Sequence, residues 1–302
     1  MALSGQQYLI RAGEHEAVVV EVGAGLRSYS VAGVDIVPTY GDDVLAPKCC
    51  GGVLVPWPNR LRDGRYTFDE TARQLPLTEP AHHNAAHGLG RWARWRVRDH
   101  GVASVTMSLD IVPQTGWPFE VRVDVTYMLD AEYGLSVTAL AHNHGSGRAP
   151  FGAGFHPYLA LRGHPLADVM LRLPARHRMI LDEVQVPVGV QSVGATEYDF
   201  TAGRVLGALR MDDGFTDLHT EQGRGYAEVH TGSGGARLWF DETYRYLQVF
   251  TADPLIDDLP AIAIEPMTCA ADAFNTGQGL IVLEPGGTWT GSWGIQPLPA
   301  AK

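Results

Sequence analysis

The sequence predicts an all-β protein with the architecture of a large antiparallel β-sandwich. Short runs rich in β-branched and aromatic residues follow one another along the chain, and turn-forming residues separate them. The 302 residues include 35 glycines and 19 prolines, and no segment shows the apolar spacing of an amphipathic helix. Many short strands joined by turns bury their apolar faces best when two antiparallel sheets pack together.

Strands are predicted from the beginning of the chain onward. Between Ala17 and Val37, β-branched pieces alternate with glycine-containing turns, which is typical of hairpins. The clearest pair lies within residues 119–141, where the sequence DAEYG forms the turn. Alternation puts Val121, Val123 and Val125 on one face of this hairpin. Further strands are predicted at 104–111, 227–230, 236–240, 246–251 and 261–265.

The segments between the predicted strands indicate how the chain is divided into domains. We find no low-complexity linker and no internal repeat at a fixed period, so residues 1–302 are predicted to form a single domain.

Charge and cysteine content narrow the function classes. The formal net charge of −11 disfavours binding to nucleic acid or to anionic membranes, and favours a neutral or polar small-molecule partner. The first residues lack a basic and then apolar leader, and no apolar run approaches the ~18 residues of a spanning helix. We therefore expect a soluble, cytoplasmic protein. Cys49, Cys50 and Cys269 are expected to be reduced thiols, since three cysteines make no disulfide framework.

A single carboxylate follows an apolar strand in the segment AIAIEPM. Pro266 has no amide hydrogen, so the strand should end near it and leave Glu265 at the mouth of the strand. Such a carboxylate is a candidate general base. A water-exposed glutamate at a strand end is the alternative.

Two further loops present basic side chains. In VPWPNR, two prolines stiffen the backbone just before Asn59 and Arg60, so the guanidinium could donate a fixed fork of hydrogen bonds to ligand oxygens. An arginine that only bridges loop carbonyls is the alternative. In AHHNAAHGLG, His82, His83 and His87 crowd together, but no HExxH pattern is present and we predict no metal site. Gly88 should let the backbone beside His87 approach a ligand closely.

Two more segments carry candidate residues. In GAGFHPY, His156 follows glycines that permit close approach, although a structural histidine is the common alternative. In MDDGFTDL, Asp212 and Asp217 lie near Phe215, where a carboxylate could accept sugar hydroxyls and an aromatic ring could stack on a sugar. An acidic turn is the alternative there.

Together these segments resemble the aldose 1-epimerase (mutarotase) family. The resemblance rests on PWPNR, NAAHGLG, GFHPY, DDGF and IEPMTCAADAFN, completed by LEPGGTW, which occur in the family's order over most of the chain. It implies a galactose mutarotase-like supersandwich that interconverts the α and β anomers of a free sugar without a metal or other cofactor.

The resemblance also implies roles for individual residues. Glu265 would be the general base on the anomeric hydroxyl, and His156 the general acid on the ring oxygen. The remaining sugar hydroxyls would be held by Arg60, His87 and an aspartate, either Asp212 or Asp217. Asn59 belongs to the PWPNR motif, and Gln248 resembles a family glutamine that contacts sugar.

The sequence departs from the family pattern in places, and alternatives follow from this. AHGLG stands where Leu-His-Gly-Gly is common, and the PWPNR and FTDL details look most like a bacterial subgroup that includes sulfoquinovose mutarotases. An anionic or modified sugar is therefore an alternative to glucose or galactose.

A catalytically silent carbohydrate-binding β-sandwich is an alternative function, although it would have no need of a paired acid and base. A hexose-6-phosphate 1-epimerase is a third, with Arg91, Arg94 and Arg96 as the candidate phosphate site. The oligomeric state does not follow from the sequence.

Overall fold

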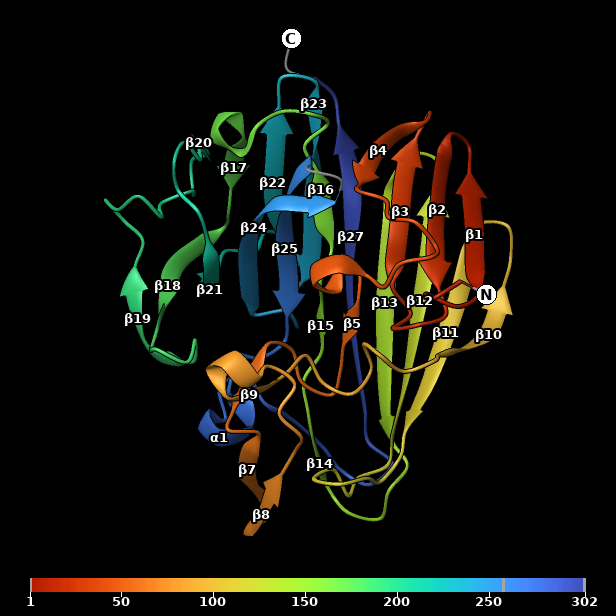
Figure 1. Ribbon diagram of the computed structural model, residues 1–302, viewed down its shortest axis with the longest axis vertical. Helices are drawn as coiled ribbons and strands as arrows, with labels where there is room; N and C mark the ends of the chain where they lie inside the picture. Colours follow the sequence, from red (N-terminus) through yellow and green to blue (C-terminus); the bar gives the residue numbers. More distant parts are fainter. Residues whose placement is uncertain (1, 257–258, 301–302) are drawn as a thin grey trace.

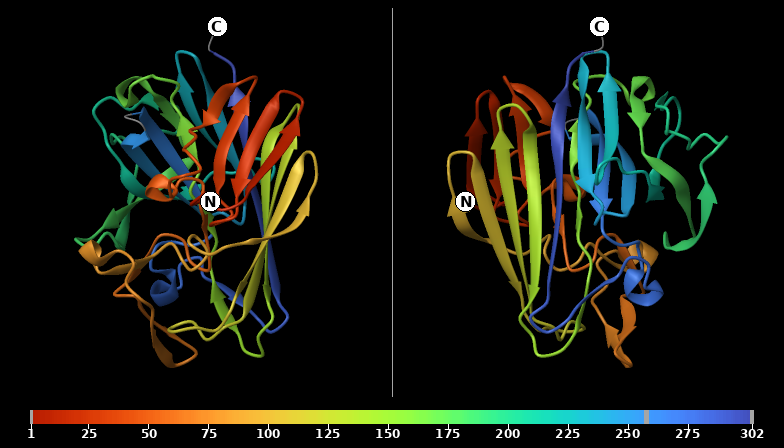
Figure 2. Two further views of the ribbon diagram at one scale, coloured as in Figure 1. Left: turned by 45° about the vertical axis from the view of Figure 1, so that its right-hand side comes forward. Right: turned by 180° about the vertical axis from the view of Figure 1, so that it is seen from behind.

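The computed structural model describes residues 2–256 and 259–300. One layer is a nine-stranded antiparallel sheet, which Figure 2 shows from behind in its right-hand view. Its strands, in spatial order, are β10 (Arg96–His100), β11 (Ser104–Ile111), β12 (Val121–Asp130), β13 (Gly134–Asn143), β27 (Thr288–Leu298), β23 (Gly234–Asp241), β22 (Arg224–Thr231), β17 (Met170–Arg172) and β20 (Arg204–Val205).

The opposite layer contains two sheets that lie side by side (Figure 1). A four-stranded meander packs against β11 and β12 and consists of β1 (Gln7–Ala12), β2 (His15–Val20), β3 (Leu26–Val31) and β4 (Val34–Val37). An eight-stranded sheet runs in the order β19 (Pro187–Ser192), β18 (Ala175–Leu181), β21 (Asp212–Leu218), β24 (Tyr246–Ile256), β25 (Leu259–Met267), β15 (Gly154–Phe155) and β5 (Val53–Leu54), and β16 (Tyr158–Ala160) also pairs with β25.

Short elements occupy one end of the sandwich and the connections between its layers. Three two-stranded ladders pair β6 (Arg60–Arg62) with β9 (Asn84–Ala86), β7 (Arg65–Phe68) with β8 (Thr71–Gln74), and β14 (Ala149–Phe151) with β26 (Ile281–Leu283). In the described part of the chain, helical structure is limited to α1 (Ala273–Thr276) and three 3₁₀ turns, Pro47–Cys49, Pro80–His82 and Leu166–Asp168. Within residues 2–256 and 259–300, no helix has the length and apolar character needed to cross a membrane.

The hairpin of β12 and β13 shows how the sequence pattern builds the core. Val121, Val123 and Val125 are fully buried, whereas Arg122 and the other alternate residues face outward. Burying each such valine contributes about 1.5–3 kcal/mol. A one-residue slip would expose the whole apolar face, so the pattern fixes the register in which Asp130 pairs with Gly134. The predicted faces and turn of this hairpin are confirmed.

The end of β25 differs from the predicted strand for a local reason. β25 continues through Pro266 to Met267, two residues beyond the strand predicted at 261–265. The amide of Ile264 donates to the carbonyl of Pro157, and the amide of Thr268 donates to the carbonyl of Ala153. Pro266 lies between these two residues and faces the same side of β25, opposite the break between β15 and β16. No ladder hydrogen bond is lost there, and the proline is tolerated.

The sequence prediction also missed β27, a central strand of the nine-stranded sheet. Glycines and a proline dilute its β-forming pattern. Gly294 is required where it stands, because a Cβ there would lie 2.2 Å from the carbonyl oxygen of Leu135.

Candidate active site

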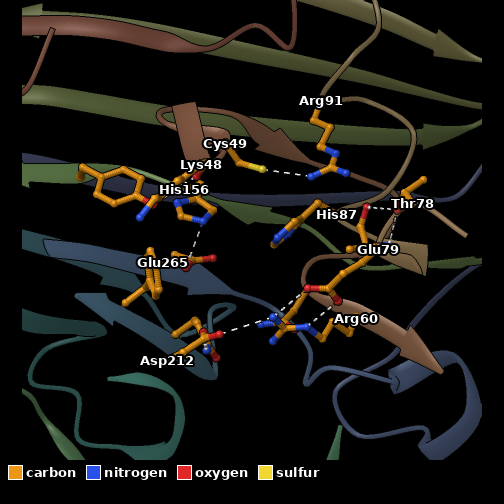
Figure 3. Close-up of a pocket in the computed structure, with 15 residues that line it drawn as sticks. Lys48, Cys49, Arg60, Thr78, Glu79, His87, Arg91, His156, Asp212 and Glu265 are labelled. Carbon is orange, nitrogen blue, oxygen red and sulfur yellow. Dashed lines mark hydrogen bonds and ion pairs between the residues drawn. The ribbon is translucent and has the colours of Figure 1, made fainter. Parts of the chain in front are cut away.

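The floor of the candidate site is the outer face of the eight-stranded sheet. Along β24 and β25, Leu247, Val249 and Ile264 point into the main core, so the alternating residues Gln248 and Glu265 point to the other face. Gln248 and Glu265 are direct partners across the two strands. Residues 48–60 and 78–91 cover this part of the face and close it into a pocket (Figure 3).

The pocket has a volume of about 230 Å³. That is below the roughly 300–1,000 Å³ of pockets for drug-sized ligands, so it suits a small molecule such as a monosaccharide. Its walls combine acidic, basic, amide, thiol and aromatic side chains. They are Lys48, Cys49, Asn59, Arg60, Thr78, Glu79, Ala86, His87, Arg91, His156, Tyr158, Asp212, Gln248, Phe250 and Glu265.

His156 is held by its backbone in the gap between β15 and β16. Its amide donates to the carbonyl of Gly52 (3.1 Å), and its carbonyl accepts from the amide of Gly51 (2.8 Å). Two residues earlier, Gly154 packs closely against Pro58, because a Cβ on Gly154 would lie 2.6 Å from Pro58 Cβ. The Tyr158 ring stacks on the imidazole with 5.0 Å between ring centroids. The histidine is therefore fixed in place before any ligand binds.

His156 and Glu265 face each other at the bottom of the pocket (Figure 3). Nε2 of His156 lies 3.3 Å from Oε1 of Glu265, and both side chains are buried. Burial lowers the pKa of His156 to about 3. Burial, reinforced by the charge of Asp212 and opposed by Arg60, raises the pKa of Glu265 well above its ordinary range. Burial thus favours a neutral imidazole beside a protonated carboxyl group.

Both members of this pair keep a free polar atom. Nδ1 of His156 and Oε2 of Glu265 are buried, and neither has a hydrogen-bond partner among the described residues. Buried polar atoms without partners are uncommon in folded proteins. Their presence at the bottom of a pocket points to a ligand that supplies the missing hydrogen bonds.

Arg60 is clamped between two carboxylates on one side of the pocket. Its Nε and Nη2 donate to Glu79 over 2.9 and 3.1 Å, and Nη2 also contacts Asp212 at 3.4 Å. Burial lowers the pKa of Arg60, but Glu79 and Asp212 raise it more, so the net shift is upward. Gln248 donates to the other oxygen of Asp212 (2.7 Å). This network presents a row of fixed donors and acceptors to hydroxyl groups.

His87 closes the pocket beside His156, with 5.7 Å between the two ring centroids. Its amide donates to the carbonyl of Asn59, and both residues adopt a left-handed backbone conformation. Burial lowers the pKa of His87 well below its ordinary value, so the ring is neutral. Gly88 differs from the expectation that it approaches a ligand, because a Cβ there would lie 2.0 Å from the carbonyl oxygen of Val55 in the protein itself.

Two cations lie at another wall of the pocket. Arg91 donates from Nη1 to the thiol of Cys49 (3.0 Å), and its Nε is buried without a partner in the described structure. Lys48 places its ammonium group 5.4 Å from the centre of the Phe250 ring. Among described residues, neither cation has a carboxylate oxygen within 4 Å, in contrast to Arg60.

The structure brings most of the sequence-predicted site residues into one pocket. Glu265, His156, Arg60, His87, Asp212, Asn59 and Gln248 all line it. Asp217 does not. It lies five residues after Asp212 on β21, so the two side chains face opposite sides of the strand, and Asp217 pairs with His177 instead at 3.2 Å. The strand geometry thus places Asp212, and not Asp217, beside the candidate acid and base.

Glu79 is the main residue that the sequence analysis missed. It precedes the histidine-rich segment, and only the pairing of β6 with β9 brings that segment alongside Arg60. The histidines themselves separate: His82 contacts Glu79, exposed His83 contacts Asp63, and only His87 enters the pocket. Across the described part of the chain, no three His, Cys, Asp or Glu side chains gather as metal ligands.

The aldose 1-epimerase family matches residues 6–296. The chain belongs to the aldose 1-epimerase family. It is 32% identical over 295 residues to the uncharacterized Escherichia coli K12 protein YihR, across 95% of this chain and 91% of that one. It is 26% identical over 259 residues to a second uncharacterized protein of that strain, YphB, across 80% and 82% of the two chains.

Solved structures share the fold at low sequence identity. A galactose mutarotase-like protein from Clostridium acetobutylicum superposes with a TM-score of 0.84 at 19% identity, over 96% of this chain and 94% of that one. A galactose 1-epimerase from Lactobacillus acidophilus superposes with a TM-score of 0.77 at 19% identity, over 95% and 92%. The predicted large antiparallel β-sandwich of galactose mutarotase type is confirmed.

Proposed function

We propose that this aldose 1-epimerase family member is a mutarotase, which interconverts the α and β anomers of a free sugar by opening and closing the ring. The observation that carries the proposal is the buried pair of His156 and Glu265, 3.3 Å apart at the bottom of a pocket lined with hydroxyl-binding groups. Mutarotation requires one proton to leave the anomeric hydroxyl and one to reach the ring oxygen. An adjacent base and acid can do both.

In the proposed ring opening, the Glu265 carboxylate takes the proton from the anomeric O1 hydroxyl. The O1 electrons form the carbonyl, the C1–O5 bond breaks, and protonated His156 gives its proton to O5. Rotation about C1–C2 presents the other carbonyl face. The O5 hydroxyl then attacks C1 and returns its proton to His156, while O1 takes back the proton on Glu265. Atoms and charge balance over the cycle.

The pKa shifts of His156 and Glu265 are compatible with this cycle. The pair has two forms with the same number of protons. In the first form Glu265 is a carboxylate and His156 an imidazolium; in the second form Glu265 is protonated and His156 is neutral. Burial by the protein favours the second form. A hydrogen bond donated by a sugar hydroxyl to Oε2 of Glu265 would favour the first form, because hydrogen bonds to a carboxylate stabilise its charge. Moving one proton over the short distance between the side chains prepares the pair for catalysis.

The test is to dissolve pure α-anomers and follow their conversion by polarimetry or by one-dimensional NMR, with and without protein. We expect the protein to accelerate anomerisation of at least one sugar in a panel of glucose, galactose, glucose 6-phosphate and sulfoquinovose. Rates unchanged by the protein for every sugar, together with sugar binding seen by NMR, would instead support the catalytically silent carbohydrate-binding alternative.

We further propose that the substrate carries an anionic substituent. Arg91 and Lys48 line the same pocket, and neither is neutralised by a carboxylate within the described residues, whereas the charge of Arg60 is balanced by Glu79 and Asp212. An unneutralised guanidinium with an unpaired Nε suits a sulfonate or phosphate oxygen. Arg94 and Arg96 pair with Glu21 and Asp110, so Arg91 alone of the three arginines is available.

The anionic preference has its own test. Each charge-assisted hydrogen bond is worth about 1.5–3 kcal/mol, so Arg91→Ala should lower kcat/KM for the anionic sugar about 10- to 100-fold. Activity toward a neutral sugar should change little. Equal losses for anionic and neutral sugars would contradict the anionic preference and leave the mutarotase assignment intact.

A further inference from the structure

A second cavity lies on the opposite side of the sandwich from the candidate active site. It has a volume of about 570 Å³ and shares no lining residue with the sugar pocket. Its floor is the outer face of β22 and β23, and residues 172–176, which lead from β17 into β18, form one wall. Figure 1 shows β22 and β23 in the upper half of the molecule, with β17 beside β22.

Four arginines from separate parts of the sequence converge on this cavity. They are Arg172, Arg176, Arg224 and Arg237. The whole chain has only 23 Lys and Arg residues and a formal net charge of −11. A concentration of guanidinium groups on such an acidic protein is therefore a local feature that general surface charge does not explain.

Two carboxylates, Glu221 and Glu228, also line the cavity, so its positive charge is only partly neutralised. Buried Glu228 accepts from Arg237 (2.7 Å) and contacts His230 (3.1 Å), while Arg172 lies 4.0 Å away. These partners lower the pKa of Glu228 against the opposing effect of burial, so it is ionised. Its charge is thus already satisfied by groups on the cavity floor.

Arg176 and Arg224 remain available. In the described part of the chain, neither has a carboxylate oxygen within 4 Å. The Arg224 guanidinium lies over the Trp239 ring, 4.5 Å from its centre, a contact that does not use its hydrogen-bond donors. The Tyr226 ring, 5.3 Å from the Arg237 guanidinium, adds an aromatic wall and a hydroxyl group.

We infer that this arginine-lined cavity is a second binding site, for a compact metabolite that carries a phosphate or pyrophosphate group. Guanidinium forks from different strands match the several oxygens of such a group better than one carboxylate. The concave shape and a volume within the range of metabolite pockets favour a small ligand. The net charge of the chain disfavours an extended polyanion such as a nucleic acid.

The experiment is isothermal titration of the full-length protein with inorganic pyrophosphate at about 0.15 M ionic strength, where weak surface attraction is screened. We expect saturable binding to the wild type and at least tenfold weaker binding to the double variant Arg176→Ala/Arg224→Ala. Arg11→Ala/Arg245→Ala is the matched control, since it removes two exposed arginines outside the cavity and should bind as the wild type does.

The result that overturns the inference is no saturable binding by the wild type, or equal weakening in the two double variants. Should the alanine variant unfold at the assay temperature, Arg176→Lys/Arg224→Lys replaces it. Lysine keeps the charge and loses the fork, so weaker binding is still expected and unchanged binding contradicts the inference. A parallel titration with glucose 6-phosphate distinguishes a phosphate ester from the free anion as the favoured ligand. Only the difference between the wild type and Arg176→Ala/Arg224→Ala is assigned to this cavity, because the sugar pocket could also bind this ester.

Discussion

The buried Glu265 has a consequence for stability as well as for the proposed catalysis. Its pKa is raised in the folded protein, so the folded state holds a proton that the unfolded chain releases above about pH 4.3. The stability contributed by that proton is present at low pH and is lost as pH rises toward the folded-state pKa. Glutamine does not titrate and keeps the shape of the protonated side chain.

We therefore expect Glu265→Gln to be at least as stable as the wild type at pH 7, with a difference in Tm that grows between pH 5 and pH 8. Thermal unfolding measured across that pH range checks the prediction. A variant that is less stable than the wild type by the same amount at every pH would contradict the assignment of a protonated, buried carboxyl group.

Glu79 acts through Arg60 and not by contact with the reacting atoms in the proposed reaction. Its two hydrogen bonds set the plane of the Arg60 guanidinium. Glu79→Gln should leave Arg60 less constrained and raise KM more than it lowers kcat, for a loss of about tenfold in kcat/KM, or about 1.4 kcal/mol. Steady-state anomerisation kinetics test this, with exposed Glu14→Gln as the control. An unchanged KM would contradict the positioning role.

At the level of the elements, the His156 loop depends on a glycine that cannot be replaced. Gly51 has a φ of +71°, and a Cβ there would lie 2.1 Å from the carbonyl oxygen of Leu26. Its amide also donates to the carbonyl of His156. Gly33 has a φ of +77° but open space around it, so it provides a control with the same backbone conformation.

Gly33→Ala should cost about 1 kcal/mol, the cost of a left-handed alanine alone. Gly51→Ala should cost at least about 1–3 kcal/mol more, because the backbone must move to relieve the clash, and it should shift His156 and lower activity. Urea unfolding of the two variants gives the comparison. Equal losses of stability would show that the packing around Gly51 does not hold the loop.

The elements also show how far the sequence could predict the structure. Hairpins such as β12 and β13 follow from alternation over ten residues, which encodes both register and buried face. Short strands such as β5 and β15 span two residues each, too few for a periodic signal. Glu265 and His156 could be recognised as candidates from their motifs. The clamp of Glu79 on Arg60 could not, because it depends on which loops the fold brings together.

At the scale of the whole molecule, one continuous core joins the layers. The main cluster of buried apolar residues includes Ile10 from the four-stranded meander, Val123 from the nine-stranded sheet and Ile264 from the eight-stranded sheet. Among the described residues, a core shared by all three sheets favours their unfolding together.

We predict that the chain unfolds as the single domain expected from its sequence. Differential scanning calorimetry should show one transition, with a calorimetric enthalpy equal to the van't Hoff enthalpy. Two resolved transitions, or a protease-resistant fragment that refolds alone, would contradict a single cooperative unit.

In the proposed reaction, Glu265 and His156 share one proton and use it to open and close a sugar ring. The most direct measurement is NMR exchange between α and β anomers of the best substrate, with wild type, Glu265→Gln and His156→Asn. Loss of a general acid or base typically costs 10²–10⁴-fold, so each variant should lose at least about 100-fold in kcat while still binding the sugar and remaining folded. Near wild-type exchange by either variant would contradict the assigned pair.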